Sequence, residues 1–179
     1  MSAAANDRAS GRRSRTYADL SVGDEARLTR LVLKDDFIVF AHASGNLNPI
    51  HLAGEGDGAA RAPAMWVGAL VSAVLGNVLP GPGTVYRSQT LVFREAARDG
   101  DDLVIGVRVR EKRADPEVVL ETFVDRADGT RLCDGEAVVA APAAAVEAPD
   151  PDDVPGLTVR RHRHFEALLE RARALPPIV

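Results

Sequence analysis

The sequence predicts an α+β fold in which an antiparallel sheet wraps around one buried helix. The first observation behind this prediction is the segment 65–79, which is apolar on almost every face. A helix that is apolar on all faces is either buried in a protein core or spans a membrane. A membrane span needs roughly 18 apolar residues, and this segment is shorter, so we expect it in the core. The second observation is the part of the chain after this segment, where runs of alternating apolar residues are separated by turn-forming residues.

The domain is predicted to span residues 16–142, after a polar tail (1–15) with too little apolar content to fold, which we expect to be disordered. Residues 25–33 alternate well enough to form a strand. Asp35 or Asp36 can then cap a short amphipathic helix, which Gly45 is expected to end. One face of that helix carries Phe37, Phe40, Ala41 and Ser44.

The central helix follows Pro63 and ends in a turn rich in Pro and Gly, 79–83. Strands are expected at 86–93, 103–111, 118–124 and 132–140. Asp-Gly and Asp-Pro pairs separate them, and both are turn formers. A sheet curled around a helix is the hot-dog arrangement. Because such a sheet covers the helix on one side only, we expect a homodimer.

The C-terminal part of the chain is predicted to lie outside this domain. Residues 143–156 are rich in Ala, Pro and Asp and are interpreted as a linker. Residues 157–179 are predicted to contain an amphipathic helix. Its apolar face carries Phe165, Leu168, Leu169 and Ala172.

Composition excludes several classes of function. The chain has 179 residues, a formal net charge of −4 and one cysteine, Cys133. An acidic balance argues against a general nucleic-acid-binding protein, and a single cysteine permits neither an intrachain disulfide nor a thiolate-bound metal cluster. The sequence shows neither a membrane span nor a secretory signal. These features predict a soluble, cytoplasmic protein with no metal site and no cofactor.

His51 is the candidate for proton transfer among the four histidines. It follows a stretch that leaves a helix, turns and passes a proline, and loops held by rigid elements concentrate functional side chains. An imidazole titrates near neutrality, so it can accept or donate a proton. Taken alone, the residues leave two interpretations open, a functional His51 and a histidine that pins the loop. We interpret His162 and His164 as surface residues and His42 as a surface or supporting residue.

One segment of the chain, FAHASGNLNPIHL at 40–52, resembles the hydratase signature of the MaoC-like family, the (R)-specific enoyl-CoA hydratases and dehydratases. Further similarities lie at 79–83, Tyr86, Gln89, Phe93, 100–101 and 135–138, so the resemblance spans about 16–142. It implies a hot-dog fold and the reversible, stereospecific addition of water across a trans-2-enoyl thioester. The thioester of CoA or a carrier protein is then the substrate, and no cofactor is implied.

The resemblance also implies site residues. In the family an Asp and a His hold and activate one water; the His matches His51, but the Asp position is occupied by Asn46. An amide cannot accept a proton, and losing one proton-transfer partner costs roughly 10²–10⁴-fold in rate. Asn46 is therefore expected to orient the water, although Asn also suits a helix-ending turn. Ser44, Asn48 and Gln89 are the other matching residues assigned to substrate binding.

A second departure precedes the central helix. The family shows His-Gly-Met there, with the Gly amide donating to the thioester carbonyl, whereas this chain has Pro63-Ala64-Met65. Backbone N–H groups at a helix N-terminus favour developing negative charge whatever the side chain. Since Pro63 has no N–H, the donor is expected to be Ala64 or Met65.

Two alternatives to an active hydratase remain open. Asn46 could mark a weak or inactive domain that binds acyl-CoA or docks a partner. A hot-dog thioesterase is the less favoured alternative, because such enzymes usually carry a carboxylate on or near the central helix and 65–79 has none.

The segment 164–177 resembles the opening helix of phosphate acetyl- and butyryltransferases. This resemblance implies a phosphate acyltransferase domain or partner. The alternative is an amphipathic helix that docks on its own domain or on a partner.

Overall fold

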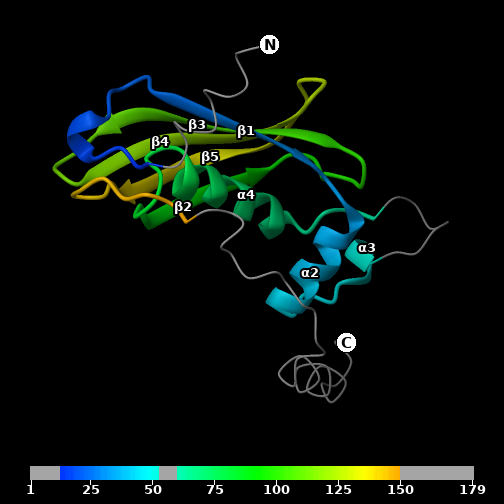
Figure 1. Ribbon diagram of the computed structural model, residues 1–179. Helices are drawn as coiled ribbons and strands as arrows, with labels where there is room; N and C mark the ends of the chain where they lie inside the picture. The colour runs from blue at the N-terminus through cyan, green and yellow to red at the C-terminus, as the bar shows by residue number, and fades with distance from the viewer. Residues whose placement is uncertain (1–12, 53–59, 150–179) are drawn as a thin grey trace, which may run out of the picture.

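The computed structural model describes residues 13–52 and 60–149, which form an antiparallel sheet with helices against one face and at one end (Figure 1). Its strands are β1 (Glu25–Leu31), β2 (Val85–Phe93), β3 (Asp102–Lys112), β4 (Glu117–Arg126) and β5 (Arg131–Ala140). They lie in the order β1-β3-β4-β5-β2, each antiparallel to its neighbours. The two edges of the sheet are therefore β1 and β2, and each of the five predicted strands is confirmed.

The central helix is α4 (Ala64–Asn77), two residues shorter at its end than the predicted segment. One face of α4 is buried against the sheet through Trp66, Val67, Val71, Val74 and Leu75. The inward residues of β3 oppose it and are also buried: Leu103, Ile105, Val107 and Val109. This alternation was predicted from the sequence, and the α+β hot-dog fold is confirmed.

The opposite face of α4 is not covered by the described part of the chain. Met65 is 60% exposed, and Ala69 and Ser72 are also exposed. The apolar character of this face is thus not explained by burial within one chain. The expectation that the sheet covers α4 on one side only is confirmed.

The helix α2 (Lys34–Ser44) leads from β1 across the end of the sheet (Figure 1). Its first residue, Lys34, precedes the predicted capping residues, Asp35 and Asp36. The Asp36 carboxylate nevertheless accepts a hydrogen bond from the Leu33 N–H at 3.2 Å. Gly45 ends the helix in the left-handed conformation (φ 74°), as predicted, with its N–H donating to the Ala41 carbonyl. The buried Phe37 ring meets the Trp66 ring edge-on at 5.7 Å, which fixes α2 against α4.

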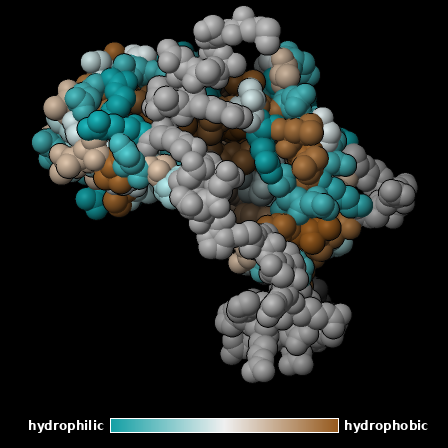
Figure 2. Space-filling model, in the orientation of Figure 1, coloured by the Kyte–Doolittle hydropathy of each residue, from teal (hydrophilic) through white to brown (hydrophobic). Residues whose placement is uncertain are grey.

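A short helix, α3 (Pro49–Leu52), corrects the expectation that His51 lies in a loop. Its start has a physical reason, because the Asn48 side-chain oxygen accepts the Ile50 N–H and proline suits the first helical position. Apolar side chains are exposed on α2 and α3, where the surface is brown in Figure 2. They are Ile38, Val39, Ile50 and Leu52.

Both described ends of the chain pack beyond the predicted limits of 16 and 142. Ser14 is buried, and its main chain and hydroxyl each pair with the main chain of Val146. A short 3-10 helix, η1 (Tyr17–Asp19), then leads towards β1. The predicted C-terminal helix (157–179), with its resemblance to phosphate acyltransferases, lies outside the described residues.

Candidate active site

His51 is held in a defined orientation by a main-chain carbonyl. Its side chain is buried (9% exposed), and Nδ1 lies 2.7 Å from the carbonyl oxygen of Arg61. A carbonyl oxygen can only accept, so a neutral imidazole here carries its hydrogen on Nδ1. The lone pair of Nε2 then remains available to take a proton.

The carbonyl that orients His51 belongs to the segment that leads into α4. The Arg61 N–H donates to the Ile50 carbonyl at 3.1 Å, and the Ala62 N–H donates to the Ala97 carbonyl at 2.8 Å. The segment at Arg61, three residues before Ala64, is thus tied to α3 by one main-chain contact and by the His51 side chain, and Ala62 ties it to Ala97. This role of Arg61 could not be predicted from the sequence, because any residue type supplies the same backbone carbonyl.

Ser44, Asn46 and Asn48 form a chain of local hydrogen bonds between α2 and α3. The Ser44 hydroxyl accepts the Asn46 N–H at 3.2 Å, and Asn46 Oδ1 accepts the Asn48 N–H at 3.2 Å. The turn role expected for Asn46 is thus observed, and its orientation of a water stays a prediction. Its oxygen is used in turn formation, while its Nδ2 hydrogens have no acceptor among the described residues and can donate to a ligand.

The N-terminus of α4 offers free donors. Trp66 N–H bonds the Pro63 carbonyl at 2.9 Å, but the N–H groups of Ala64 and Met65 have no acceptor among the described residues. No described residue other than glycine has a positive φ, so Ala64 adopts ordinary helical geometry without the family glycine. These two N–H groups and the helix dipole favour negative charge at this point.

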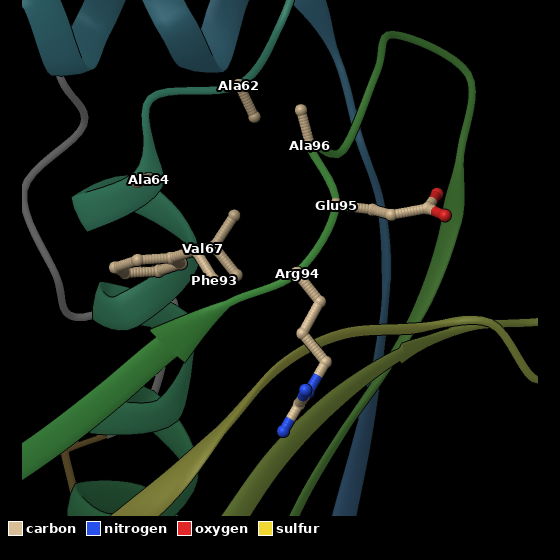
Figure 3. A pocket seen from close by; sticks show the side chains of 7 residues that line it. All are labelled: Ala62, Ala64, Val67, Phe93, Arg94, Glu95 and Ala96. Carbon is tan, nitrogen blue, oxygen red and sulfur yellow. The ribbon is translucent and has the colours of Figure 1, made fainter.

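A cavity of about 220 Å³ opens beside Ala64. Figure 3 shows Val67 and Phe93 side by side on its wall, while the side chains of Arg94 and Glu95 extend away from α4. Arg94 forms a two-point ion pair with Asp134, at 2.5 and 3.0 Å. The wall next to the helix N-terminus is consequently apolar.

Met65 and Gln89 both line a second cavity, of about 380 Å³, between α4 and β2. The predicted site residues thus fall into two groups. Ser44, Asn46, Asn48 and His51 share the α2–α3 turn, and Ala64, Met65 and Gln89 line the cavities along α4. The contact between His51 and Arg61 joins the two groups along the chain.

Other reactive groups give no competing site in the described residues. Burial raises the pKa of the Cys133 thiol to about 11, which keeps it protonated and unreactive. Among residues 13–52 and 60–149, no cluster of His, Cys, Asp and Glu could hold a metal ion. None of the helices described has the length and apolar character to cross a membrane.

Comparison with known proteins places the chain among enzymes that add or remove water. No family model matches the sequence. The chain is 37% identical over 133 residues to a 3-hydroxybutyryl-CoA dehydratase of Methylorubrum extorquens, covering 70% of this chain and 83% of that protein. It is 35% identical over 129 residues to an (R)-specific enoyl-CoA hydratase of Aeromonas caviae, covering 69% and 96%.

A solved structure agrees with these relatives. The unliganded R-hydratase of Pseudomonas aeruginosa superposes with a TM-score of 0.75 at 35% identity, covering 83% of this chain and 98% of that one. These relatives lend no support to the resemblance of 164–177 to phosphate acyltransferases. With the hot-dog fold they show that the chain belongs to the MaoC-like family of hydro-lyases, the (R)-specific enoyl-CoA hydratases and 3-hydroxyacyl thioester dehydratases.

Proposed function

We propose that this chain adds water reversibly to trans-2-enoyl thioesters of CoA or a carrier protein, giving (R)-3-hydroxyacyl thioesters, with His51 as the group that moves the proton. The observation that carries this proposal is the 2.7 Å contact between His51 Nδ1 and the Arg61 carbonyl, which leaves Nε2 as a base. The relatives named above carry out hydration or dehydration of such thioesters according to their names.

His51 takes a proton from the water as the water oxygen bonds to C3 of the enoyl group. Electrons shift from the double bond to the thioester oxygen, where the N–H of Ala64 or Met65 stabilises the negative charge. The imidazolium then returns its proton to C2, and the neutral thioester is restored. One water is consumed, its hydroxyl on C3 and its hydrogen on C2, so the protein ends the cycle unchanged.

Asn46 orients the water without carrying a proton. Its Oδ1 is bonded to the Asn48 N–H, which leaves the Nδ2 hydrogens to donate to the water oxygen. When Asn46 Nδ2 donates to the water oxygen, a hydrogen of that water can point towards His51, the base. Because an amide does not titrate, His51 has to perform both proton transfers, and a turnover slower than that of a carboxylate-bearing site is expected.

The test is hydration of crotonyl-CoA by the full chain, followed through loss of the conjugated enoyl absorbance. Chiral analysis of the 3-hydroxybutyryl product is expected to give the (R) form. His51→Ala is expected to lower kcat/KM by about 10²–10⁴-fold. An unchanged rate in this variant, with folding preserved by circular dichroism, would show that the proton is carried elsewhere.

The second candidate is a domain that binds acyl-CoA with little turnover. It is favoured by one observation, the amide at position 46 engaged in turn formation. In that case crotonyl-CoA binds to the wild type, measured by calorimetry, but is not hydrated, and Asn46→Asp creates the activity.

Thioester cleavage is the less favoured activity, and α4 supports this ranking. Its sequence, Ala64–Asn77, contains no carboxylate. A thiol-reactive dye distinguishes the two reactions, because cleavage releases free CoA and hydration releases none.

A homodimer is the proposed assembly. The uncovered face of α4, with Met65 60% exposed, lies beside β2, whose outer edge has no strand partner among the described residues. Apolar side chains on α2 and α3 extend the surface that needs covering. A second copy against β2 and α4 would close the cavity between them into a tunnel. A cytoplasmic location and a phosphate acyltransferase partner remain predictions from the sequence.

A further inference from the structure

Two four-residue turns of the chain have the same geometry. They are the β1 turn (21–24) and the β3 turn (98–101), each directly before the strand it is named after. Each has glycine at its third position, with φ 94° and 85°, and aspartate at its fourth. The aspartate carboxylate accepts the N–H of the first residue, at 2.6 and 2.9 Å, and the aspartate N–H donates back to the carbonyl of that residue at 3.1 Å in both turns. An arginine pairs with each carboxylate, Arg15 at 2.7 Å and Arg126 at 3.2 Å.

Both turns are also joined to a neighbouring segment in the same way. The glycine N–H of the β1 turn donates to the Val109 carbonyl at 2.9 Å, and the Val109 N–H donates to the Asp24 carbonyl at 2.8 Å. In the β3 turn, Gly100 and Asp101 form the corresponding pair of contacts with Val32, at 3.0 and 2.9 Å. The two aspartates therefore make the same local contribution to the fold, and the β1 turn is an internal reference for the β3 turn.

The β3 turn has two further contacts, and both lead to the candidate active site. The carbonyl of Ala97, directly before the turn, accepts the Ala62 N–H at 2.8 Å. The Asp99 carboxylate accepts the N–H of Lys34, the first residue of α2, at 2.9 Å, where a negative charge also suits the helix dipole. The matching position of the β1 turn is Val22, whose side chain has no acceptor.

These contacts relate the two groups of site residues to each other. Ala62 directly follows Arg61, whose carbonyl orients His51, and it lies two residues before Ala64, at the N-terminus of α4. Ala62 and Ala96 both line the cavity beside Ala64 (Figure 3). The same turn holds the start of α2, whose other end leads to α3. A displaced β3 turn would therefore shift the Arg61 carbonyl relative to His51, and α2 relative to α4.

We propose that Asp101 is a positioning residue for the hydration reaction. Its carboxylate fixes the β3 turn, and the turn holds the Arg61 carbonyl against His51 and α2 beside α4. In the structure the carboxylate contacts the Arg98 N–H and Arg126, so it acts through the turn and the main chain. The inference rests on the proposed function for the reaction, whereas the orientation of His51 does not depend on turnover. A displacement of about 1 Å between reacting groups can lower a rate by roughly 10²-fold.

The experiment compares Asp101→Ala with Asp24→Ala in the full chain. Both variants remove a carboxylate with the same local contacts, so urea midpoints are expected to fall by similar amounts. Asp101→Ala is expected to lower kcat for crotonyl-CoA hydration about tenfold or more, with KM changed less than about twofold. Asp24→Ala should keep kcat within about twofold of wild type. Equal losses of kcat in the two variants, or a change in KM alone, would show that the β3 turn contributes to stability and not to positioning.

Conservative variants test the role of the carboxylate. Asp101→Asn keeps an oxygen that can accept the Arg98 N–H, and kcat is expected to stay within about threefold of wild type. A loss as large as that of Asp101→Ala would overturn the role assigned to this acceptor. If Asp101→Ala does not fold, Asp101→Glu replaces it, because it keeps the charge beside Arg126 but moves the carboxylate by one carbon. The same losses are then expected of Asp101→Glu.

The hydrogen on His51 Nδ1 gives a second readout that does not require turnover. Because it is buried and bonded to the Arg61 carbonyl, it is expected to exchange slowly and to give a downfield proton resonance, identified by its absence in His51→Ala. This resonance should persist in Asp24→Ala and Asp101→Asn and be lost in Asp101→Ala. A resonance that persists in Asp101→Ala overturns the proposal even where kcat falls, since Asp101 then acts without holding the Arg61 carbonyl.

The two readouts separate this inference from the proposed function. A wild type that does not hydrate crotonyl-CoA, but loses the resonance on Asp101→Ala and not on Asp24→Ala, refutes the hydratase and supports the positioning of His51 by the β3 turn. An active wild type whose Asp101→Ala variant keeps both kcat and the resonance refutes the positioning and leaves the proposed function standing.

Discussion

The ring of Phe123 on β4 lies against Gly106 on β3, on the face of the sheet turned away from α4. A Cβ atom at position 106 would overlap the ring, so only glycine leaves room for it. The guanidinium groups of Arg27 and Arg131 cover the ring at 5.3 and 4.9 Å from its centroid. The aromatic side chain is consequently buried (5% exposed) on the face of the sheet that α4 does not cover.

Gly106→Ala is therefore expected to destabilise the fold by about 1–3 kcal/mol, because the ring has to leave its position. Urea unfolding followed by circular dichroism measures this loss. The double variant Gly106→Ala with Phe123→Leu is expected to lose less than the sum of the two single changes. Additive losses would mean that the ring does not respond to the new methyl group.

Gly76→Ala provides the matched control in α4. A Cβ atom there meets nothing within 4 Å, and alanine favours a helix over glycine by up to about 1 kcal/mol. The same urea experiment should therefore show a small stabilisation. A loss at Gly76 as large as that at Gly106 would indicate that the effect of alanine does not depend on the contact with Phe123.

Asn46→Asp is expected to raise kcat for crotonyl-CoA hydration by roughly 10–100-fold, since a carboxylate supplies the second proton-transfer group. The turn should persist, because a carboxylate oxygen can accept the Asn48 N–H as the amide oxygen does. Initial rates near pH 7 measure the effect. Asn46→Ala, which removes both the donor and the acceptor, is the control and is expected to fall below wild type. A kcat of Asn46→Asp below that of wild type would mean that the Nδ2 donor contributes more to the rate than a second base does.

Acid sensitivity is expected from the pair of Arg94 and Asp134. The Arg94 guanidinium, bonded at two points, lowers the pKa of the Asp134 carboxyl. A carboxyl whose pKa is lower in the folded state stabilises the fold above its unfolded value of about 3.9 and loses that contribution as the pH falls through the folded value. The stability difference between wild type and Asp134→Asn should thus be present at pH 7 and shrink below about pH 4. Urea midpoints at pH 7 and pH 3 measure it, and a difference that grows in acid would contradict the assignment.

The fold could be predicted in large part because its signals are local. The apolar segment that became α4 and the alternation of residues such as Ile105 and Val107 report directly on burial. Asp-Gly turns mark the strand ends. Each of these features depends on a few neighbours in the chain, so periodicity suffices to find them.

The site was harder to predict from the sequence, because its key contacts join residues distant in sequence or involve the backbone. The sequence singled out His51 but not the carbonyl of Arg61 that orients it. It identified Asn46 as a departure from the family without showing which of its atoms the turn uses. Gln89 Nε2 donates to the Thr122 hydroxyl, 33 residues away, and no pattern reports this contact.

The edge strand β2 gives the last prediction, a dimer that depends on this edge and not on β1. β2 pairs with β5 alone, and Val92 on it is 53% exposed. Val92→Lys places a charge on this apolar edge, which opposes strand pairing with a second copy, and is expected to raise the dimer dissociation constant at least about tenfold.

Leu28→Lys on β1, where the side chain is 36% exposed, is the matched control at the opposite edge and should leave the dimer unchanged. Sedimentation equilibrium of the full chain measures both variants. Hydration activity should decline with dimer content in Val92→Lys, because the cavity between α4 and β2 is open in the single chain and a second copy is needed to close it. If only Leu28→Lys weakens the dimer, the interface lies at β1, and the cavity between α4 and β2 stays open to solvent.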